Sequence, residues 1–261
     1  MCGTCGCGAD VRLLVPSEPV QPGHHHHEDH THSRGDDEAR TIVLQEKVLA
    51  RNDALAEQNR DWLRRRNVLA VNLMSSPGAG KTTLLERTAG DLSGITISVI
   101  EGDQETALDA DRMRRAGCRV IQINTGTGCH LDAAMVGQAL TALDPPGGSV
   151  VVIENVGNLV CPALFDLGEA CRVVLASVTE GADKPVKYPH MFRASGLMVL
   201  NKIDLLPHVQ FDVDRCIGYA RQVNPRIGIL KLSATRGEGL DEWYAWLRQQ
   251  AGQLRQGSVL I

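Results

Sequence analysis

The sequence is poor in aromatic residues, in excess basic charge and in long apolar runs. With three residues each of Trp, Tyr and Phe among 261, any core must be mostly aliphatic. The formal net charge of -4 argues against the basic footprint of a nucleic-acid-binding protein, so no nucleic-acid partner is expected. The apolar runs are far shorter than the roughly 20 residues of a membrane-spanning helix, so no membrane partner is expected either.

No basic region followed by an apolar run stands near Met1, so the pattern of a secretory leader is absent. We therefore expect a cytoplasmic chain whose thiols stay reduced. Its eight cysteines then serve as core residues or metal ligands rather than as a disulfide framework. The length allows one α/β domain of about 200 residues with additional segments.

The N-terminal segment, residues 1–40, differs in composition from the rest. It holds three closely spaced cysteines and the stretch HHHHEDHTH at residues 24–32, which contains six of the nine histidines. Prolines, glycines and acidic residues without an apolar pattern predict disorder over residues 8–40. We therefore expect residues 1–40 to form a flexible metal-binding segment.

An amphipathic helix is expected at residues 41–67. Leu44, Val48, Leu55 and Trp62 are spaced by four and seven residues, with Leu49, Ala56 and Leu63 beside them. Such a helix can pack on the main domain or pair with a partner helix.

From residue 68 to residue 251, short β-rich runs alternate with segments of helical pattern, and residues 252–261 are expected to form a C-terminal tail. The expected strands are 68–74, 95–100, 119–124, 149–154, 172–178, 196–201 and 227–232. The expected helices are 82–92, 104–116, 131–142, 213–223 and 239–251. This alternation predicts an α/β fold with a mainly parallel sheet covered by helices on both faces. Polar, glycine-containing loops follow nearly every strand, and ligands bind at that edge of such sheets.

The run SSPGAGKTT at residues 75–83 follows a predicted buried strand and opens a predicted helix. That context is typical of the phosphate-binding loop of P-loop NTPases, although Ser75 stands where the first glycine is usual. Lys81 is expected to reach the β- and γ-phosphates, and the Thr82 hydroxyl to bind Mg²⁺. The loop residues expected to hold the nucleotide are Gly78, Ala79, Gly80, Lys81, Thr82 and Thr83.

Two further loops favour guanine as the base. In NKID, Asp204 can accept hydrogen bonds from the ring N–H and the exocyclic amine of guanine, and adenine lacks both donors. The Lys202 stem can lie along the base, and Asn201 can brace the loop. Ser233 and Ala234 can offer a backbone N–H to the guanine carbonyl.

Asp103 and Glu154 complete the expected catalytic set, and both can act on Mg²⁺ directly or through its water shell. Glu154 stands where many P-loop GTPases have aspartate, and Gly157 can follow the γ-phosphate with its N–H. No clear glutamine is present to orient the attacking water, so Asp103 is the candidate for that role. Hydrolysis is expected to be slow unless a partner or dimerisation assists it.

Cys129, His130 and Cys161 are predicted to lie in neighbouring loops at the same edge. Two thiols and one imidazole form a partial metal-ligand set, with the fourth ligand supplied by solvent or by a second subunit. On spacing alone, the favoured interpretation is a small apolar filler at Cys161 and an ordinary loop histidine at His130.

Longer runs resemble the HypB family of nickel-incorporation GTPases of [NiFe]-hydrogenase maturation. They are SSPGAGKTTLLE, EGDQET, NTGTGCHLDA, ENVGNLVCPALFDLGE, SVTEGADKPVKYPHMF and LNKIDLLP, and they lie between residues 41 and 250. The segment EGADKPVKYP contains one alanine more than the family pattern, and its Lys184 and Lys187 match a lysine-bearing loop.

The resemblance implies a dimerising GTPase that uses GTP/GDP with Mg²⁺ and helps to load nickel. It implies that Cys129, His130 and Cys161 bind Zn²⁺ or Ni²⁺ at the dimer interface, in communication with the nucleotide. The implied partners are a nickel-delivery accessory protein and the hydrogenase large subunit. Two alternatives stay open, namely a nickel-storage protein with a secondary GTPase and a related metallochaperone for another nickel enzyme such as urease.

The first residues, MCGTCGCG, carry Cys2, Cys5 and Cys7. Thiolates suit Zn²⁺, Cu⁺ or Ni²⁺, and the α-amine of Met1 can act as a fourth donor because its pKa of about 8 allows displacement of the proton. Chemistry alone favours zinc. The resemblance, which extends to a terminal CxxCGC motif in some family members, implies nickel, with the histidine stretch as an accessory site.

Overall fold

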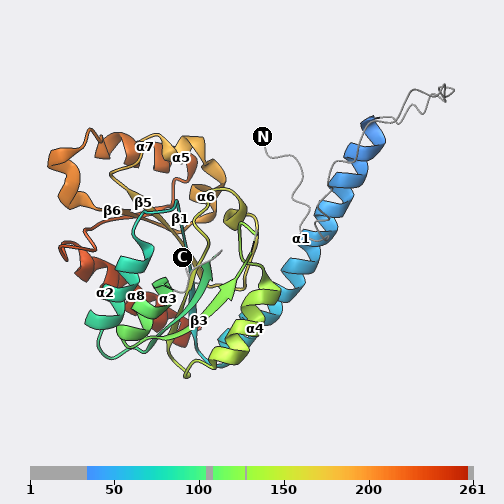
Figure 1. Cartoon of the computed structure of the whole chain (residues 1–261), viewed down its shortest axis with the longest axis horizontal. Coiled ribbons are helices and arrows are strands. Elements are labelled where there is room, and N and C mark those ends of the chain that lie inside the picture. Colours follow the sequence, from blue (N-terminus) through green and yellow to red (C-terminus); the bar gives the residue numbers. More distant parts are fainter. Residues whose placement is uncertain (1–33, 104–107, 127, 258–261) are drawn as a thin grey trace, which may run out of the picture. The chain divides into compact units, whose positions relative to one another are not determined.

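A computed structural model describes residues 34–103, 108–126 and 128–257, and only the helical backbone of residues 34–46. Its strands are Leu69–Ser75 (β1), Ile97–Asp103 (β2), Arg119–Asn124 (β3), Val150–Glu154 (β4), Cys171–Ser177 (β5), Leu197–Asn201 (β6) and Gly228–Lys231 (β7). They form one sheet in the order β3-β2-β4-β1-β5-β6-β7, and every neighbouring pair is parallel (Figure 1). The predicted α/β fold with a mainly parallel sheet is therefore confirmed.

Helix α1 precedes the first strand, α8 follows the last one, and the other helices lie in the connections between strands. The helices are Arg34–Arg65 (α1), Lys81–Asp91 (α2), Leu108–Arg115 (α3), Ala133–Leu143 (α4), Lys184–Lys187 (α5), Pro189–Ala194 (α6), Val213–Val223 (α7) and Leu240–Arg255 (α8), with 3-10 turns at Cys161–Ala163 (η1) and Ile203–His208 (η2). Two of them begin at a side-chain cap. Asp132 accepts from the Met135 N–H, and Asp212 accepts from the Arg215 N–H, so each satisfies a free donor of the first turn.

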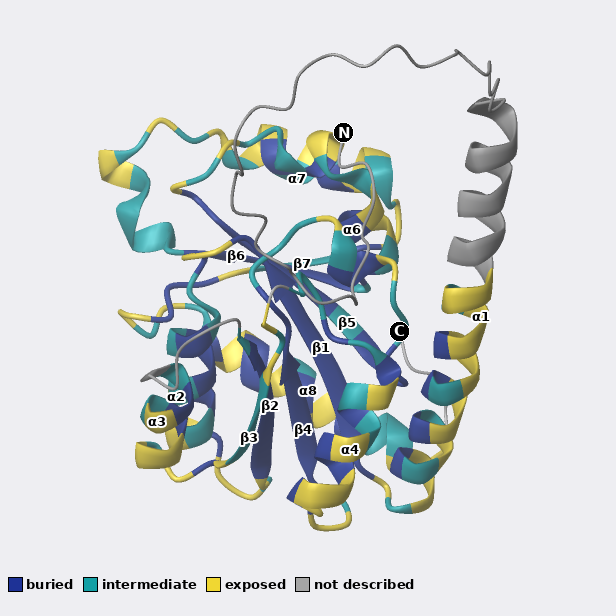
Figure 2. Ribbon diagram, turned by 45° about the vertical axis from the view of Figure 1, so that its right-hand side comes forward, coloured by how far each residue is buried: buried dark blue, intermediate teal, exposed yellow. Residues whose placement is uncertain are grey.

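Apolar side chains fill both faces of the sheet because successive strand residues point to opposite sides. Leu69, Val71 and Leu73 of β1 pack with residues of α2, α3 and α8 on one face. On the other face, Ala70 belongs to a cluster with residues of α1 and α4, and Met74 belongs to one with residues of α6 and α7. Figure 2 shows the central strands buried between these layers. The core thus fixes the carboxyl edge of the sheet, from which the glycine-containing loops emerge.

The predicted elements agree with the observed ones to within a few residues, with three differences. The segments α5, α6, η1 and η2 were not predicted, because they are short and contain prolines. Helix α8 continues to Arg255 and thus through part of the predicted tail. Residues 104–107, predicted to begin a helix, lie outside the described residues.

Helix α1 begins at Arg34, before the predicted start at residue 41, so residues 34–40 are helical rather than disordered. Its part from Leu49 onward belongs to the compact unit Leu49–Ile261. The predicted packing on the main domain holds for that part, but the buried face differs from the expected one. Val48 is 50% exposed, whereas Ala56 and Leu63 are buried together with the polar residues Asn52 and Asn59.

Candidate nucleotide site and neighbouring metal-ligand cluster

The loop between β1 and α2 has the backbone of a phosphate-binding site. Gly78 and Gly80 have φ values of 72° and 103°, which side chains rarely tolerate. A Cβ on Gly80 would lie 2.5 Å from Nδ2 of Asn201, so close approach also requires glycine there. Lys81 begins α2, and its Nζ donates to Ser75 Oγ at 2.9 Å. The lysine therefore lies across the loop, at a helix N-terminus that favours anions.

Asn201 and Lys202 hold the phosphate loop from the end of β6. Asn201 Nδ2 donates to the Ala79 carbonyl at 2.9 Å, and its Oδ1 accepts from the N–H groups of Lys202 and Ala234. Lys202 Nζ donates to the Gly78 carbonyl at 2.7 Å. Through these contacts Asn201 joins three of the predicted nucleotide loops.

The Thr82 hydroxyl lies between two carboxylates. Its Oγ1 is 3.0 Å from Asp109 Oδ2 and 3.2 Å from Glu154 Oε1. The second carboxylate oxygen of Glu154 is buried, with no hydrogen-bond partner among the described residues. Hydroxyl and carboxylate oxygens are the ligands that Mg²⁺ prefers, and an orphaned buried oxygen is costly without a cation. These residues therefore fit Mg²⁺, and Asp109 joins the predicted Thr82 and Glu154.

Burial changes the acid–base properties of this site. Burial, reinforced by the charge of Glu154, raises the pKa of Glu101 to about 8. Burial raises the pKa of Glu154 to about 7, against the opposing charge of Lys81. Burial also lowers the pKa of Lys81. Glu101 and Glu154 are register partners on β2 and β4, which places the two carboxyl groups side by side. Such a cluster favours binding of a cation.

These residues line a cavity of about 520 Å³ at the carboxyl edge of the sheet. The predicted residues that line it are Gly78, Gly80, Lys81, Thr82, Thr83, Asp103, Glu154, Gly157 and Lys202. Of the other predicted residues, Asp204 lies in the first turn of η2. The Ser233 N–H donates to the Glu238 carbonyl, and the Ala234 N–H donates to Asn201, so both groups already have partners within the protein.

A second cluster brings together the three predicted internal ligands. One ligand atom each of Cys129, His130 and Cys161 lies within 4.8 Å of the others. Cys129 Sγ is 3.6 Å from His130 Nδ1, and the imidazole stacks on Phe165 with ring centroids 3.9 Å apart. Burial lowers the pKa of His130, which favours the neutral imidazole that a metal requires. Two sulfurs and one nitrogen are a donor set that suits Zn²⁺ or Ni²⁺.

Asn155 connects the two clusters. It is 1% exposed and lines the nucleotide cavity. Its Oδ1 accepts from the N–H of Leu131, the residue after His130, at 3.3 Å, and from the N–H of Val156 at 3.0 Å. Its Nδ2 lies 3.4 Å from Asn72 Oδ1. One side chain therefore contacts both the loop that carries Cys129 and His130 and the loop that leads to Gly157.

The motifs did not identify several residues of this region. Asp109 and Glu101 carry no recognisable spacing, and Asn155 was not assigned a role beside Glu154. Lys184, matched only to a family loop, donates to Ser76 Oγ of the phosphate loop at 2.6 Å and lies 3.3 Å from Glu180. Asp109 lies in the first turn of α3, but the predicted helix began at residue 104, so the sequence offered no signal that singled it out.

Cys2, Cys5, Cys7 and the histidine stretch at residues 24–32 lie outside the described residues. Among the described residues, no helix combines the length and the apolar character that crossing a membrane requires.

Comparison with known proteins identifies relatives over most of the chain. Residues 69–231 match the family model described as CobW/HypB/UreG, nucleotide-binding domain. A hydrogenase maturation factor HypB from Rhizobium leguminosarum bv. viciae is 56% identical over 223 residues, which is 85% of this chain and 75% of that protein. The crystal structure of HypB from Archaeoglobus fulgidus is 42% identical with a TM-score of 0.73, and covers 78% of this chain and 100% of that one. The structure of HypB from Helicobacter pylori in complex with nickel is 35% identical with a TM-score of 0.74, and covers 81% of this chain and 98% of that one.

Proposed function

The chain belongs to the CobW/HypB/UreG family of nucleotide-binding proteins, with HypB hydrogenase maturation factors among its relatives, and on that premise we propose that it is a GTP-hydrolysing nickel metallochaperone. It binds nickel and assists its insertion into the large subunit of [NiFe]-hydrogenase. The single observation that carries this proposal is Asn155, which contacts both the nucleotide cavity and the metal-ligand loop.

In this proposal the nucleotide is GTP, held by the loop 78–83 with its phosphates at Lys81. Asp204 reads the base, Asn201 and Lys202 support it, and a backbone N–H near Ser233 and Ala234 meets its carbonyl. Thr82, Glu154 and Asp109 would hold Mg²⁺, which would neutralise charge on the phosphates. Asp103 orients the attacking water, and the Gly157 N–H follows the γ-phosphate. Intrinsic hydrolysis to GDP is slow.

Cys129, His130 and Cys161 bind Ni²⁺ or Zn²⁺ in the proposed mechanism. Three protein donors leave a four-coordinate ion one ligand short. Val160 and Leu164, on either side of the turn that begins at Cys161, are 48% and 51% exposed, and exposed apolar groups of this kind favour association. A homodimer promoted by nucleotide or metal would bring a second copy to this face.

The N-terminal cysteines Cys2, Cys5 and Cys7 receive Ni²⁺ in this proposal, and the chain acts in the cytoplasm. Its partners are a nickel-delivery accessory protein and the hydrogenase large subunit. The chain then has two metal positions of different chemistry. One is formed by soft thiolate donors in the N-terminal segment, and the other by two thiols and one imidazole in the nucleotide-binding domain.

The variant Lys81→Ala tests the requirement for GTP hydrolysis. Loss of the ammonium group removes charge at the phosphates, so we expect GTP turnover to fall by roughly a hundredfold or more. Hydrogenase maturation at limiting nickel should fail in cells that carry this variant. Lys231→Ala, an exposed substitution on β7, is the matched control. Normal maturation with Lys81→Ala would refute the proposal and favour a nickel-storage role.

A further inference from the structure

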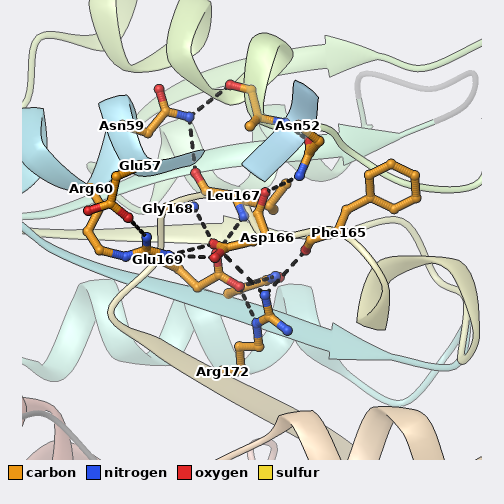
Figure 3. A network of polar contacts seen from close by, with 12 residues as sticks. Asn52, Glu57, Asn59, Arg60, Phe165, Asp166, Leu167, Gly168, Glu169 and Arg172 are labelled. Atoms are coloured by element: carbon orange, nitrogen blue, oxygen red, sulfur yellow. Dashed lines mark hydrogen bonds and ion pairs between the residues drawn. The ribbon is translucent and has the colours of Figure 1, made fainter. Parts of the chain in front are cut away.

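Two buried asparagines lie on one face of α1. Asn52 and Asn59 are 5% and 8% exposed, and their spacing of seven residues places them on the same side of the helix, two turns apart. A buried amide is costly unless its polar atoms are hydrogen-bonded. Both side chains meet that requirement with backbone groups far away in the sequence, as Figure 3 shows.

Each asparagine joins the same two segments of the chain. Asn52 Oδ1 accepts from the Ala133 N–H at 2.9 Å, and its Nδ2 donates to the Asp166 carbonyl at 2.7 Å. Asn59 Nδ2 donates to the carbonyls of Ala133 at 2.8 Å and Leu167 at 3.0 Å. Both amides therefore bridge the start of α4 to residues 166–167.

Those two segments carry the metal-ligand cluster. Ala133 follows closely after His130, and Asp166 follows Phe165, whose ring stacks on the His130 imidazole. Cys161 opens the same stretch that ends at Leu167. The bridges thus connect the loop of Cys129 and His130 to the stretch that carries Cys161.

The contact between α1 and residues 166–168 leaves little room for adjustment. Gly168 has a φ of +89°, and a Cβ there would lie 2.5 Å from the Ala56 carbonyl of α1. Arg60 of α1 donates to both carboxylate oxygens of Asp166, at 2.8 and 2.6 Å. Of the two bridged segments, the Arg60 side chain bonds only residues 166–167 in the described part of the chain, whereas the asparagines bond both. Anchoring of α1 and bridging of the two segments can therefore be separated by mutation.

We propose that Asn52 and Asn59 are positioning residues of the metal site, which set the spacing between the Cys129–His130 pair and Cys161. The inference rests on the proposed function, since it takes these three residues as metal ligands. The part of α1 from Leu49 to Arg65 is then a component of the metal centre. Residues that orient metal ligands typically change affinity by about 10- to 100-fold when they are removed.

The test uses the full chain with Cys2→Ser, Cys5→Ser and Cys7→Ser and with the six histidines of residues 24–32 replaced by asparagine, so that these N-terminal donors do not compete with the internal site. Ni²⁺ and Co²⁺ titrations are compared between this chain and its Asn52→Ala, Asn59→Ala form. We expect the dissociation constant for Ni²⁺ to rise roughly tenfold or more, and the Co²⁺ absorption spectrum to change. The GTP affinity serves as the measure of an intact fold. If the double variant loses that affinity, the single variants Asn52→Ala and Asn59→Ala are measured instead.

Two controls separate positioning from stability. Asn224→Ala removes an amide that bonds three backbone carbonyls elsewhere, and Arg60→Ala loosens α1 without breaking either bridge. Both should keep the parent Co²⁺ spectrum. The inference is overturned if folded asparagine variants keep the parent metal affinity and spectrum, or if Arg60→Ala changes them equally. If the parent chain itself binds no metal at this site, the metal part of the proposed function fails.

Discussion

Asp204 has a role defined by the hydrogen-bond donors of the base. In the proposed complex its carboxylate accepts from the ring N–H and from the exocyclic amine of guanine. Each hydrogen bond to a charged group contributes roughly 1.5–3 kcal/mol. The residue stands in the first turn of η2, two positions after Lys202, which donates to the phosphate loop. In the proposal, base recognition and phosphate binding are therefore linked through residues of one short segment.

Inosine triphosphate tests this role because inosine keeps the ring N–H but lacks the amine. We expect the chain to bind GTP about 10- to 100-fold more tightly than inosine triphosphate, the equivalent of one charged hydrogen bond. In Asp204→Ala both nucleotides should bind weakly and alike, as measured by calorimetry. A preference for GTP that survives this substitution would assign recognition of the amine to another residue.

Glu101 shows how burial beside like charges stores unfavourable energy. Its side chain is 3% exposed, and one carboxylate oxygen is buried with no hydrogen-bond partner among the described residues. Its pKa in the folded chain, about 8, lies above the ordinary value of 4.5. Between these values the folded state binds more protons than the unfolded state. The contribution of Glu101 to stability is thus present below about pH 4.5 and is lost as the pH rises through about 8.

Substitution Glu101→Gln should therefore stabilise the nucleotide-free and metal-free chain at pH 8. We expect the free energy of unfolding to rise by at least about 1.4 kcal/mol, the equivalent of one pKa unit, with a smaller gain at pH 5. Urea unfolding at the two pH values measures the difference. Glu242→Gln, an exposed substitution on α8, is the control. An equal effect of Glu101→Gln at both pH values would contradict the role of burial.

At the scale of elements, the loop after β4 serves both clusters. It begins with Asn155 at the nucleotide cavity, passes Gly157 and reaches Cys161 at the start of η1. The loop after β3 ends in α4 and carries Cys129 and His130. Asn155 accepts the Leu131 N–H, so in the proposal a displacement near the γ-phosphate end of the cavity would move the second loop as well. A contact of this kind can carry energetic coupling between two sites.

Removal of the hydrogen bond between Asn155 and the Leu131 N–H should uncouple the nucleotide site from the metal-ligand cluster while leaving each in place. In the parent chain we expect a GTP analogue to change the Ni²⁺ affinity of the internal cluster by about 5- to 150-fold relative to GDP, the usual range of allosteric coupling. In Asn155→Ala the ratio should approach one. Metal titrations in each nucleotide measure it, with Asn224→Ala as control. A ratio preserved in Asn155→Ala would place the coupling elsewhere.

Local sequence predicts some of these elements well and others poorly. The strand-loop-helix pattern around Lys81 predicts its place at the start of α2 because all the necessary groups are contiguous. The same holds for α7, where Asp212 caps the helix and the predicted bounds 213–223 are the observed ones. Asn52 and Asn59 could not be predicted, since a polar residue on an amphipathic helix indicates a solvent-facing position. Their partners are separated from them by 74 to 114 residues. Asp109 meets Thr82 only through the tertiary fold.

At the scale of the whole molecule, the proposed function combines a nucleotide site, an internal metal site and the N-terminal cysteines. The first two lie in the described part of the chain and share the edge of one sheet. In the proposal, the exposed Val160 and Leu164 on either side of the Cys161 turn would offer a second copy an apolar face at that edge. In the proposal, the state of the nucleotide therefore controls both metal affinity and dimerisation.

One measurement tests this central claim most directly. The full chain, with the N-terminal cysteines and histidines substituted as in the test above, is titrated with Ni²⁺, and separately with Zn²⁺, in the presence of GDP or of a non-hydrolysable GTP analogue, while light scattering follows its mass. We predict that the metal affinity of the Cys129, His130 and Cys161 cluster differs between the two nucleotides by at least about fivefold, and that the analogue with metal increases the dimer fraction. A metal affinity and a mass that are the same with either nucleotide would contradict the account.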